Sequence, residues 1–217
     1  IDPVQSSIRL LAYESLSSAT TLAERLERLP LLVETLNSNH MLSAVYVGYR
    51  NGEFLLVRRL READVRQRLA APADAEFLVQ SQSLDQAGRM VGEWRFYDAD
   101  LIQLSAEVRP DYQYDPRTRP WFDEALAQAE TVLTHPYVFF TTREIGLTLA
   151  QRSADGRAVI GMDASVDDLG GEVQDLRMTT GTEMAVVDGA GRVVAYPDLQ
   201  RVIVGEGEEL RLSHIGE

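Results

Sequence analysis

The chain has 217 residues, of which 45% are hydrophobic and 25% charged, a composition typical of a globular protein that buries a core. It has no cysteine, which excludes disulfides and thiolate metal sites, and its net charge of −13 argues against nucleic acid or an anionic membrane as partner. No apolar run reaches the ~20 residues that cross a bilayer, and no signal peptide precedes Ile1, so we expect a soluble piece of a longer protein.

Residues 5–39 are predicted to form a long helix. Its apolar residues recur at steps of 4, 3, 4 and 3 as a heptad seam: Leu22, Leu26, Leu29, Val33 and Leu36. Two interpretations stay open, a helix that covers a sheet and a helix that pairs with a second copy of the chain. Pro30 is expected to kink or split the helix near Leu29.

Alternating apolar segments and turn residues predict strands in the first half of the chain. Asn51-Gly52 is the strongest hairpin signal. The predicted strands are residues 43–49, 54–60, 76–83 and 92–98. Two further segments are ambiguous: residues 61–71 form a helix or a polar excursion, and residues 101–108 a strand or a short helix.

The second half continues with a short helix and more hairpins. A helix over residues 121–130 opens at Pro120, and residues 131–141 are β-rich. Two hairpins are predicted, the first of residues 146–152 and 157–162, the second of residues 182–187 and 192–196. Between them, a capping box at Ser165 starts a helix that runs to about Met178. This order predicts an α+β protein of two lobes.

The most unusual stretch is residues 112–123, Tyr-Gln-Tyr-Asp-Pro-Arg-Thr-Arg-Pro-Trp-Phe-Asp. Its two prolines exclude regular helix or central strand. Arginine offers a planar fork to a carboxylate, and aromatic side chains supply rigid walls, so the stretch indicates a small-molecule pocket. The alternative is a packed loop in which Arg117 or Arg119 pairs with Asp115 or Asp123.

Within this stretch, residues 114–122 resemble the signature of double Cache domains, the extracytoplasmic sensor domains of bacterial transmembrane receptors. Residues 136–139, Pro-Tyr-Val-Phe, and residues 159–163, Val-Ile-Gly-Met-Asp, lie where that family has its second tyrosine and its aspartate. The resemblance extends from the N-terminal helix to about Pro197.

The resemblance implies an α+β fold with a long N-terminal helix and two PAS-like (Cache) lobes built on antiparallel sheets. The expected divisions are the helix (residues 1–40), a membrane-distal ligand-binding lobe with its linking helix (41–178) and a membrane-proximal lobe (179–217). The second lobe is short of strands and is expected to be partial. Membrane helices would flank the domain in the parent, an inner-membrane receptor with this part in the periplasm. Its output domain would be a kinase, chemoreceptor, cyclase or phosphodiesterase.

The resemblance also implies a set of ligand-binding residues: Tyr114, Arg119, Trp121, Phe122, Tyr137 and Asp163. As in amino-acid-sensing members, Arg119 and Trp121 would hold a carboxylate, and Tyr137 and Asp163 would face an amine. Phe122 stands where those members have tyrosine, so we expect a carboxylate ligand whose amine is weakly required.

Structural alternatives remain for these residues. In these alternatives, Asp163 would cap backbone N–H groups, Tyr137 would fill space on the sheet, and Arg119 would form an internal ion pair with Asp163.

The sequence offers little catalytic chemistry. It has no phosphate loop, no Gly-x-Ser-x-Gly and no His-Glu-x-x-His, and His40, His135 and His214 lack metal-ligand spacing. We therefore expect a non-enzymatic sensor of a small carboxylate-containing metabolite, without cofactor or metal, that forms a homodimer through its N-terminal helix in the intact receptor. The alternative is a dimerisation module with a vestigial pocket, regulated by a partner protein.

Overall fold

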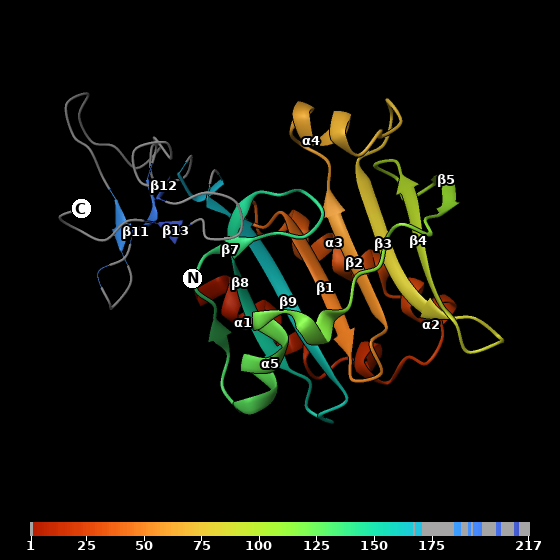
Figure 1. Cartoon of the computed structure of the whole chain (residues 1–217), viewed down its shortest axis with the longest axis horizontal. Helices are drawn as coiled ribbons and strands as arrows, with labels where there is room; N and C mark the ends of the chain where they lie inside the picture. Colours follow the sequence, from red (N-terminus) through yellow and green to blue (C-terminus); the bar gives the residue numbers. More distant parts are fainter. Residues whose placement is uncertain are drawn as a thin grey trace.

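The computed structural model describes residues 2–166, 168–170, 185–187, 191, 193–196, 203–204 and 211–212. Over this part of the chain, nine strands form one antiparallel sheet in the order β5-β4-β3-β2-β1-β9-β8-β6, with β7 also paired to β8 (Figure 1). The strands are β1 (Ala44–Tyr49), β2 (Phe54–Arg59), β3 (Phe77–Leu84), β4 (Met90–Tyr97), β5 (Gln103–Val108), β6 (Val132–Leu133), β7 (Tyr137–Val138), β8 (Ile145–Arg152) and β9 (Ala158–Ser165). The predicted α+β class is confirmed, and the ambiguous segment 101–108 contains a strand.

The N-terminal helix is present, but in pieces: α1 (Asp2–Leu11), the 3₁₀ turn η1 (Ser15–Ser18), α2 (Leu22–Leu26) and α3 (Leu29–Asn37). The single long helix expected over residues 5–39 is therefore corrected. Thr21 begins a new helix because its side chain accepts a hydrogen bond from the Glu24 N–H, while Glu24 accepts one from the Thr21 N–H. Pro30 lies in the first turn of α3, so the predicted split near Leu29 is confirmed.

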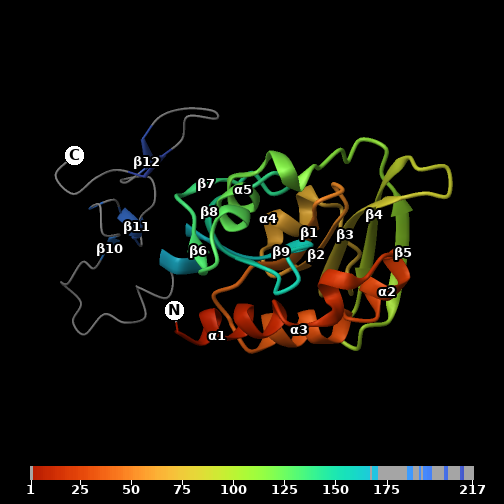
Figure 2. The same cartoon turned by 90° about the horizontal axis from the view of Figure 1, so that it is seen from below.

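The helices α1–α3 cover one face of the sheet (Figure 2). Side chains alternate between the faces of a strand, and Val45 and Val47 of β1 point toward these helices. Leu29, Val33 and Leu36 of the heptad seam are buried in the same apolar layer. The apolar seam of the helices therefore packs against the chain's own sheet, as the first of the two interpretations predicted.

The opposite face carries shorter elements: α4 (Ala63–Arg68), the 3₁₀ turn η2 (Pro116–Thr118), α5 (Pro120–Ala127) and the segment joining β7 to β8. Trp121 and Phe122 of α5 pack against Tyr46 of β1. Gly48 permits this close approach, because a Cβ there would lie 2.7 Å from the Trp121 ring and 2.8 Å from Pro116. The motif that stood out in the sequence thus lies directly on the central strand.

Four short strands lie outside the large sheet. The predicted hairpin after residue 182 is confirmed as β10 (Val186–Val187) paired with β11 (Val193–Ala195), and β12 (Ile203–Val204) pairs with β13 (Arg211–Leu212). The predicted capping at Ser165 is seen in part, since its Oγ accepts a hydrogen bond from the Asp168 N–H at 3.0 Å. The rest of that helix and the expected lobe boundary between residues 178 and 179 fall outside the described residues. None of the described helices has the length and apolar character needed to cross a membrane.

A buried ion pair ties the N-terminal helices to the β1–β2 hairpin. The Arg25 Nη2 donates to Glu53 at 2.6 Å, and both side chains are almost wholly buried, with 1% and 6% exposed. Glu53 also accepts hydrogen bonds from the Asn51 side chain and the Leu84 N–H, and Arg25 stacks on the Tyr49 ring at 4.1 Å.

Replacing Glu53 alone should destabilise the protein strongly. Glu53→Gln leaves the Arg25 cation buried without its counter-charge, a change that typically costs about 3 to 5 kcal/mol. In urea unfolding, we expect the double variant Arg25→Met/Glu53→Met to be more stable than Glu53→Gln, since it removes both charges together. A single variant as stable as the wild type would contradict this role.

Candidate functional site

One row of residues crosses four neighbouring strands on the face away from α1–α3. Thr148 of β8 is paired with Asp163 of β9, Asp163 with Ala44 of β1, and Ala44 with Arg58 of β2. Thr148, Asp163 and Arg58 are buried, with 0%, 4% and 3% of their surface exposed. Buried charges are rare unless they are paired or functional, so this row marks the candidate site.

Asp163 is held by hydroxyl groups. Its Oδ1 accepts hydrogen bonds from Tyr46 and Thr148, both at 2.6 Å. Because the single Thr148 hydroxyl proton goes to Asp163, the Tyr137 hydroxyl donates to Thr148 at 2.6 Å. The other oxygen, Oδ2, has no hydrogen bond within the described part of the chain. The carboxylate is therefore oriented by side chains and does not cap backbone.

Burial dominates the titration of this cluster. It raises the pKa of Asp163 to about 6, against an ordinary value of 3.8, although the hydroxyl donors and the charges of Arg58 and Arg119 act in the opposite direction. Burial also raises the pKa of Tyr46 and Tyr137 well above the usual range, so both stay protonated and able to donate. At neutral pH the site contains a carboxylate ready to accept a cationic donor.

Arg119 enters the site from the segment between η2 and α5. Its Nη2 donates to the Val138 carbonyl at 2.9 Å, and its guanidinium lies 5.3 Å from the centre of the Tyr137 ring. Arg119 forms no ion pair with the described residues, so the internal pair with Asp163 is not present. Arg117, two residues earlier, does pair with Asp115 at 2.8 Å on the surface, as the packed-loop alternative expected.

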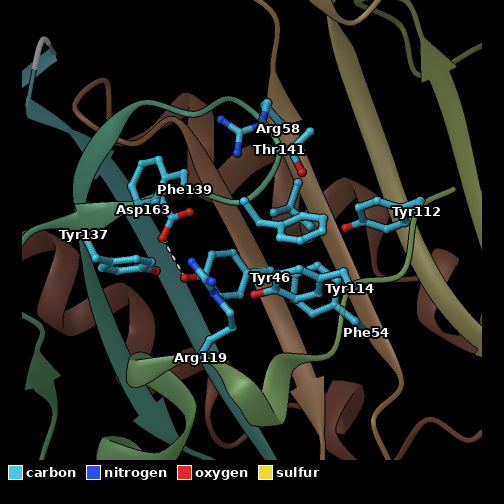
Figure 3. A pocket seen from close by; sticks show the side chains of 12 residues that line it. Tyr46, Phe54, Arg58, Tyr112, Tyr114, Arg119, Tyr137, Phe139, Thr141 and Asp163 are labelled. Atoms are coloured by element: carbon cyan, nitrogen blue, oxygen red, sulfur yellow. Dashed lines mark hydrogen bonds between the residues drawn. The ribbon is translucent and has the colours of Figure 1, made fainter. Parts of the chain in front are cut away.

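These groups surround one cavity, shown in Figure 3, where the Asp163 carboxylate lies between the Arg58 and Arg119 guanidinium groups in this view. The cavity has a volume of about 20 Å³, room for about one water molecule. Its lining residues are Tyr46, Phe54, Leu56, Arg58, Tyr112, Tyr114, Arg119, Tyr137, Phe139, Phe140, Thr141 and Asp163. Arg119, Tyr137 of β7 and three residues of the segment after β7, Phe139, Phe140 and Thr141, line the side of the cavity opposite Phe54 and Leu56 of β2.

The structure brings four of the six predicted site residues to the cavity: Tyr114, Arg119, Tyr137 and Asp163. Trp121 lies behind the wall, 1% exposed, and its indole N–H donates to the Tyr114 hydroxyl at 3.2 Å. Phe122, also 1% exposed, packs edge-on against Trp121 and does not reach the cavity. In this conformation Phe122 provides no wall for a ligand.

Sequence reasoning missed Arg58, Tyr46 and Thr148. Their signal is strand alternation, since Arg58 follows Phe54 and Leu56 on the cavity face while Val57 points to the helices. Arg58 and Arg59 are adjacent in sequence at the end of a strand, where charged residues are ordinarily exposed. Alternation places the two arginines on opposite faces, and the pairing of β2 with β1 brings Arg58 into the row of Asp163.

Asp163→Asn should stabilise the unliganded protein at pH 7.5 by up to about 3 kcal/mol. The folded-state pKa of Asp163 is raised to about 6, so its ionisation costs stability above pH 6, and this cost disappears as pH falls toward 4. Urea unfolding at pH 7.5 and pH 4.5 should therefore show a gain at the higher pH that shrinks at the lower.

The exposed Asp123 of α5 provides the matched control. Asp123→Asn removes the same charge outside the site and should give no gain at pH 7.5. If Asp163→Asn also gives no gain in the free energy of unfolding at pH 7.5, burial does not raise the pKa of Asp163 as described.

No protein-family model matches the chain. Among curated proteins, adenylate cyclase 1 of Rhizobium meliloti is 29% identical over 187 residues, which are 84% of this chain and 28% of that protein. The chemotaxis protein McpG of Pseudomonas putida is 29% identical over 136 residues, 61% of this chain and 21% of its own length. The chain thus spans about a quarter of the length of these relatives.

Solved structures with the same fold are sensory domains of chemoreceptors. The ligand-binding domain of Campylobacter jejuni Tlp3 in complex with L-valine matches 92% of this chain and 64% of its own, with a TM-score of 0.54 and 21% identity. That of Pseudomonas fluorescens CtaA in complex with L-serine matches 92% and 65%, with a TM-score of 0.51 and 18% identity. The chain has the fold of bacterial chemoreceptor sensory domains, and its resemblance to double Cache sensor domains is confirmed at the level of the fold.

Proposed function

We propose that the chain is the extracytoplasmic ligand-sensing part of a transmembrane receptor and binds a small amino-acid-like carboxylate in the cavity of its large sheet. The observation that carries this proposal is the opposition of Arg119 and Asp163 across one cavity without an ion pair between them. A ligand with a carboxylate and an ammonium group would satisfy both charges at once. Tlp3 and CtaA, which share the fold, are solved with amino acids bound, which supports this ligand class.

Each half of the ligand has a place in this arrangement. Arg119 would receive the carboxylate, as one of its nitrogens is already oriented by the Val138 carbonyl and its guanidinium also interacts with the Tyr114 hydroxyl of the cavity wall. Asp163 Oδ2 would accept from the ammonium, with Tyr137 beside it. Trp121 is a positioning residue in this scheme, because its N–H fixes the Tyr114 hydroxyl at the cavity wall.

Binding requires the cavity to enlarge, since an amino acid is several times larger than a water molecule. The segment between β7 and β8 is the part that would move, because Phe139, Phe140 and Thr141 close the cavity from there. Its opening would break a 2.9 Å hydrogen bond from Arg68 to the Thr142 carbonyl, a 3.4 Å hydrogen bond from Gln80 to the Thr141 hydroxyl, and the edge-on packing of Phe140 against the wall. The small cavity is also what a module with a vestigial pocket would show, so a binding measurement decides between the two functions.

Ligand binding should raise the melting temperature, and this rise should depend on the contact between Arg119 and the ligand carboxylate. At ~100 times its dissociation constant, a ligand stabilises the folded state by ~2.7 kcal/mol, which for a domain of this size is roughly 5 to 10 °C. A thermal-shift screen of amino acids and simple carboxylates should find such a ligand, and Arg119→Ala should abolish the shift while the free protein stays folded.

Arg117→Ala is the matched control, because Arg117 lies in the same segment but pairs with Asp115 on the surface. It should leave the shift intact. If no carboxylate stabilises the wild type, the vestigial-pocket function is favoured, and if Arg119→Ala keeps the full shift, the anchor is misassigned.

Pairing of two copies through the N-terminal helices stays a prediction for the intact receptor. Because Leu29, Val33 and Leu36 are occupied by the sheet, pairing would use outward-facing residues such as Leu10 and Tyr13, which are 73% and 83% exposed. Light scattering over a concentration series should show a monomer–dimer equilibrium that Leu10→Ser/Tyr13→Ser weakens. A strict monomer at every concentration would argue against this surface.

A further inference from the structure

Arg58 is a buried cation that feels the charge of Asp163 but forms no direct ion pair with it. Only 3% of the residue is exposed, yet its guanidinium forms no ion pair or hydrogen bond within the described part of the chain, and its Nε is buried without a partner. The other buried arginine, Arg25, has Glu53 at 2.6 Å. A buried charge without an ion pair or hydrogen bond is costly, so Arg58 lowers the stability of the unliganded protein.

The position of Arg58 relative to Asp163 is set by the sheet. Both residues are direct cross-strand partners of Ala44, so they lie two strands apart on the same face, with their Cα atoms roughly 10 Å from each other. Arg58 also lines the same cavity as Asp163 and Arg119. The cavity therefore carries two cationic groups and one anionic group.

We propose that Arg58 binds a second carboxylate of the ligand, so that the cavity selects an amino acid with an acidic side chain. This inference rests on the proposed function, in which Arg119 and Asp163 take the α-carboxylate and the ammonium. An acidic amino acid has two negative groups and one positive group, and these charges are complementary to those of Arg58, Arg119 and Asp163. A neutral amino acid would leave the Arg58 cation buried and unpaired in the complex.

The same arrangement explains why the ammonium matters. A dicarboxylate without an amine would satisfy both arginines but would place its carboxylates beside Asp163, which Tyr46 and Thr148 hold in place. The sequence-based expectation of a weakly required amine rested on Phe122, and Phe122 does not line the cavity. We therefore expect L-aspartate or L-glutamate to bind more tightly than succinate or glutarate.

The test compares acids with their amides, which have nearly the same size and shape. Calorimetry on the wild type should show L-aspartate or L-glutamate binding at least about tenfold more tightly than L-asparagine or L-glutamine, a difference of about 1.4 kcal/mol. Arg58→Met, which keeps the length of the side chain without its charge, should reduce this preference to about twofold or less while binding the amides as before. Arg58→Lys keeps a charge and should retain part of the preference.

Arg59→Met is the matched control, since Arg59 is the next residue of β2, points to the opposite face and packs over the Phe77 ring. It should keep the full preference. Arg58→Met removes a buried charge together with its attraction to Asp163, and a cooperative melting transition near that of the wild type would separate a role in binding from one in folding.

The outcomes separate this inference from the proposed function. If the amides bind as tightly as the acids, or Arg58→Met keeps the preference, the second carboxylate site is wrong while the sensor function stands. If neither acid binds but another carboxylate gives an Arg119-dependent shift, the acidic class is wrong and the sensor function again stands. If no carboxylate of any kind binds, both fail.

Discussion

The organisation of this protein depends on a sheet whose two faces differ in polarity. One face is covered by α1–α3 and is apolar, while the other carries a carboxylate and a guanidinium two strands apart in one cross-strand row. Because neighbouring side chains on a strand point to opposite faces, a shift of one residue in the register would bury Asp163 and Arg58 among the leucines of the helical layer. The apolar packing of one face thus fixes the position of the charges on the other.

The charges of the cavity are at odds with those of the whole molecule. The chain has a net charge of −13, yet its cavity contains two arginines and one aspartate. An anionic surface slows the approach of an anionic ligand, so the local field near the cavity, and not the overall charge, must favour binding. The desolvated arginines act at short range, where screening by salt is weakest.

The sequence predicted most of the strands and four of the residues that line the candidate cavity, and the reasons differ for each part. The β1–β2 hairpin was predictable because Asn51-Gly52 encodes its turn locally, and Gly52 does adopt a positive φ of 90°. The break near Leu29 was predicted from Pro30, but the breaks between α1 and α2 were missed, because the local capping of α2 by Thr21 was not recognised. Arg58 was missed because alternation places it on the face of Phe54 and Leu56, but only the pairing of β2 and β9 with β1 brings it into one row with Asp163. Trp121 was assigned from its place in the motif, but its ring is turned into the core.

The hydrogen bond between Trp121 and Tyr114 has an optical consequence. The chain has two tryptophans, and the indole of Trp121 touches a hydroxyl of the cavity wall, whereas Trp94 lies under Arg109 with its ring 4.3 Å from the guanidinium carbon. Indole emission depends on the dipoles around the ring, so a displacement of Tyr114 changes the fluorescence of Trp121 directly and reaches Trp94 only through the Tyr112 ring. The protein thus contains a built-in spectroscopic reporter of its cavity, which Trp94→Phe would isolate.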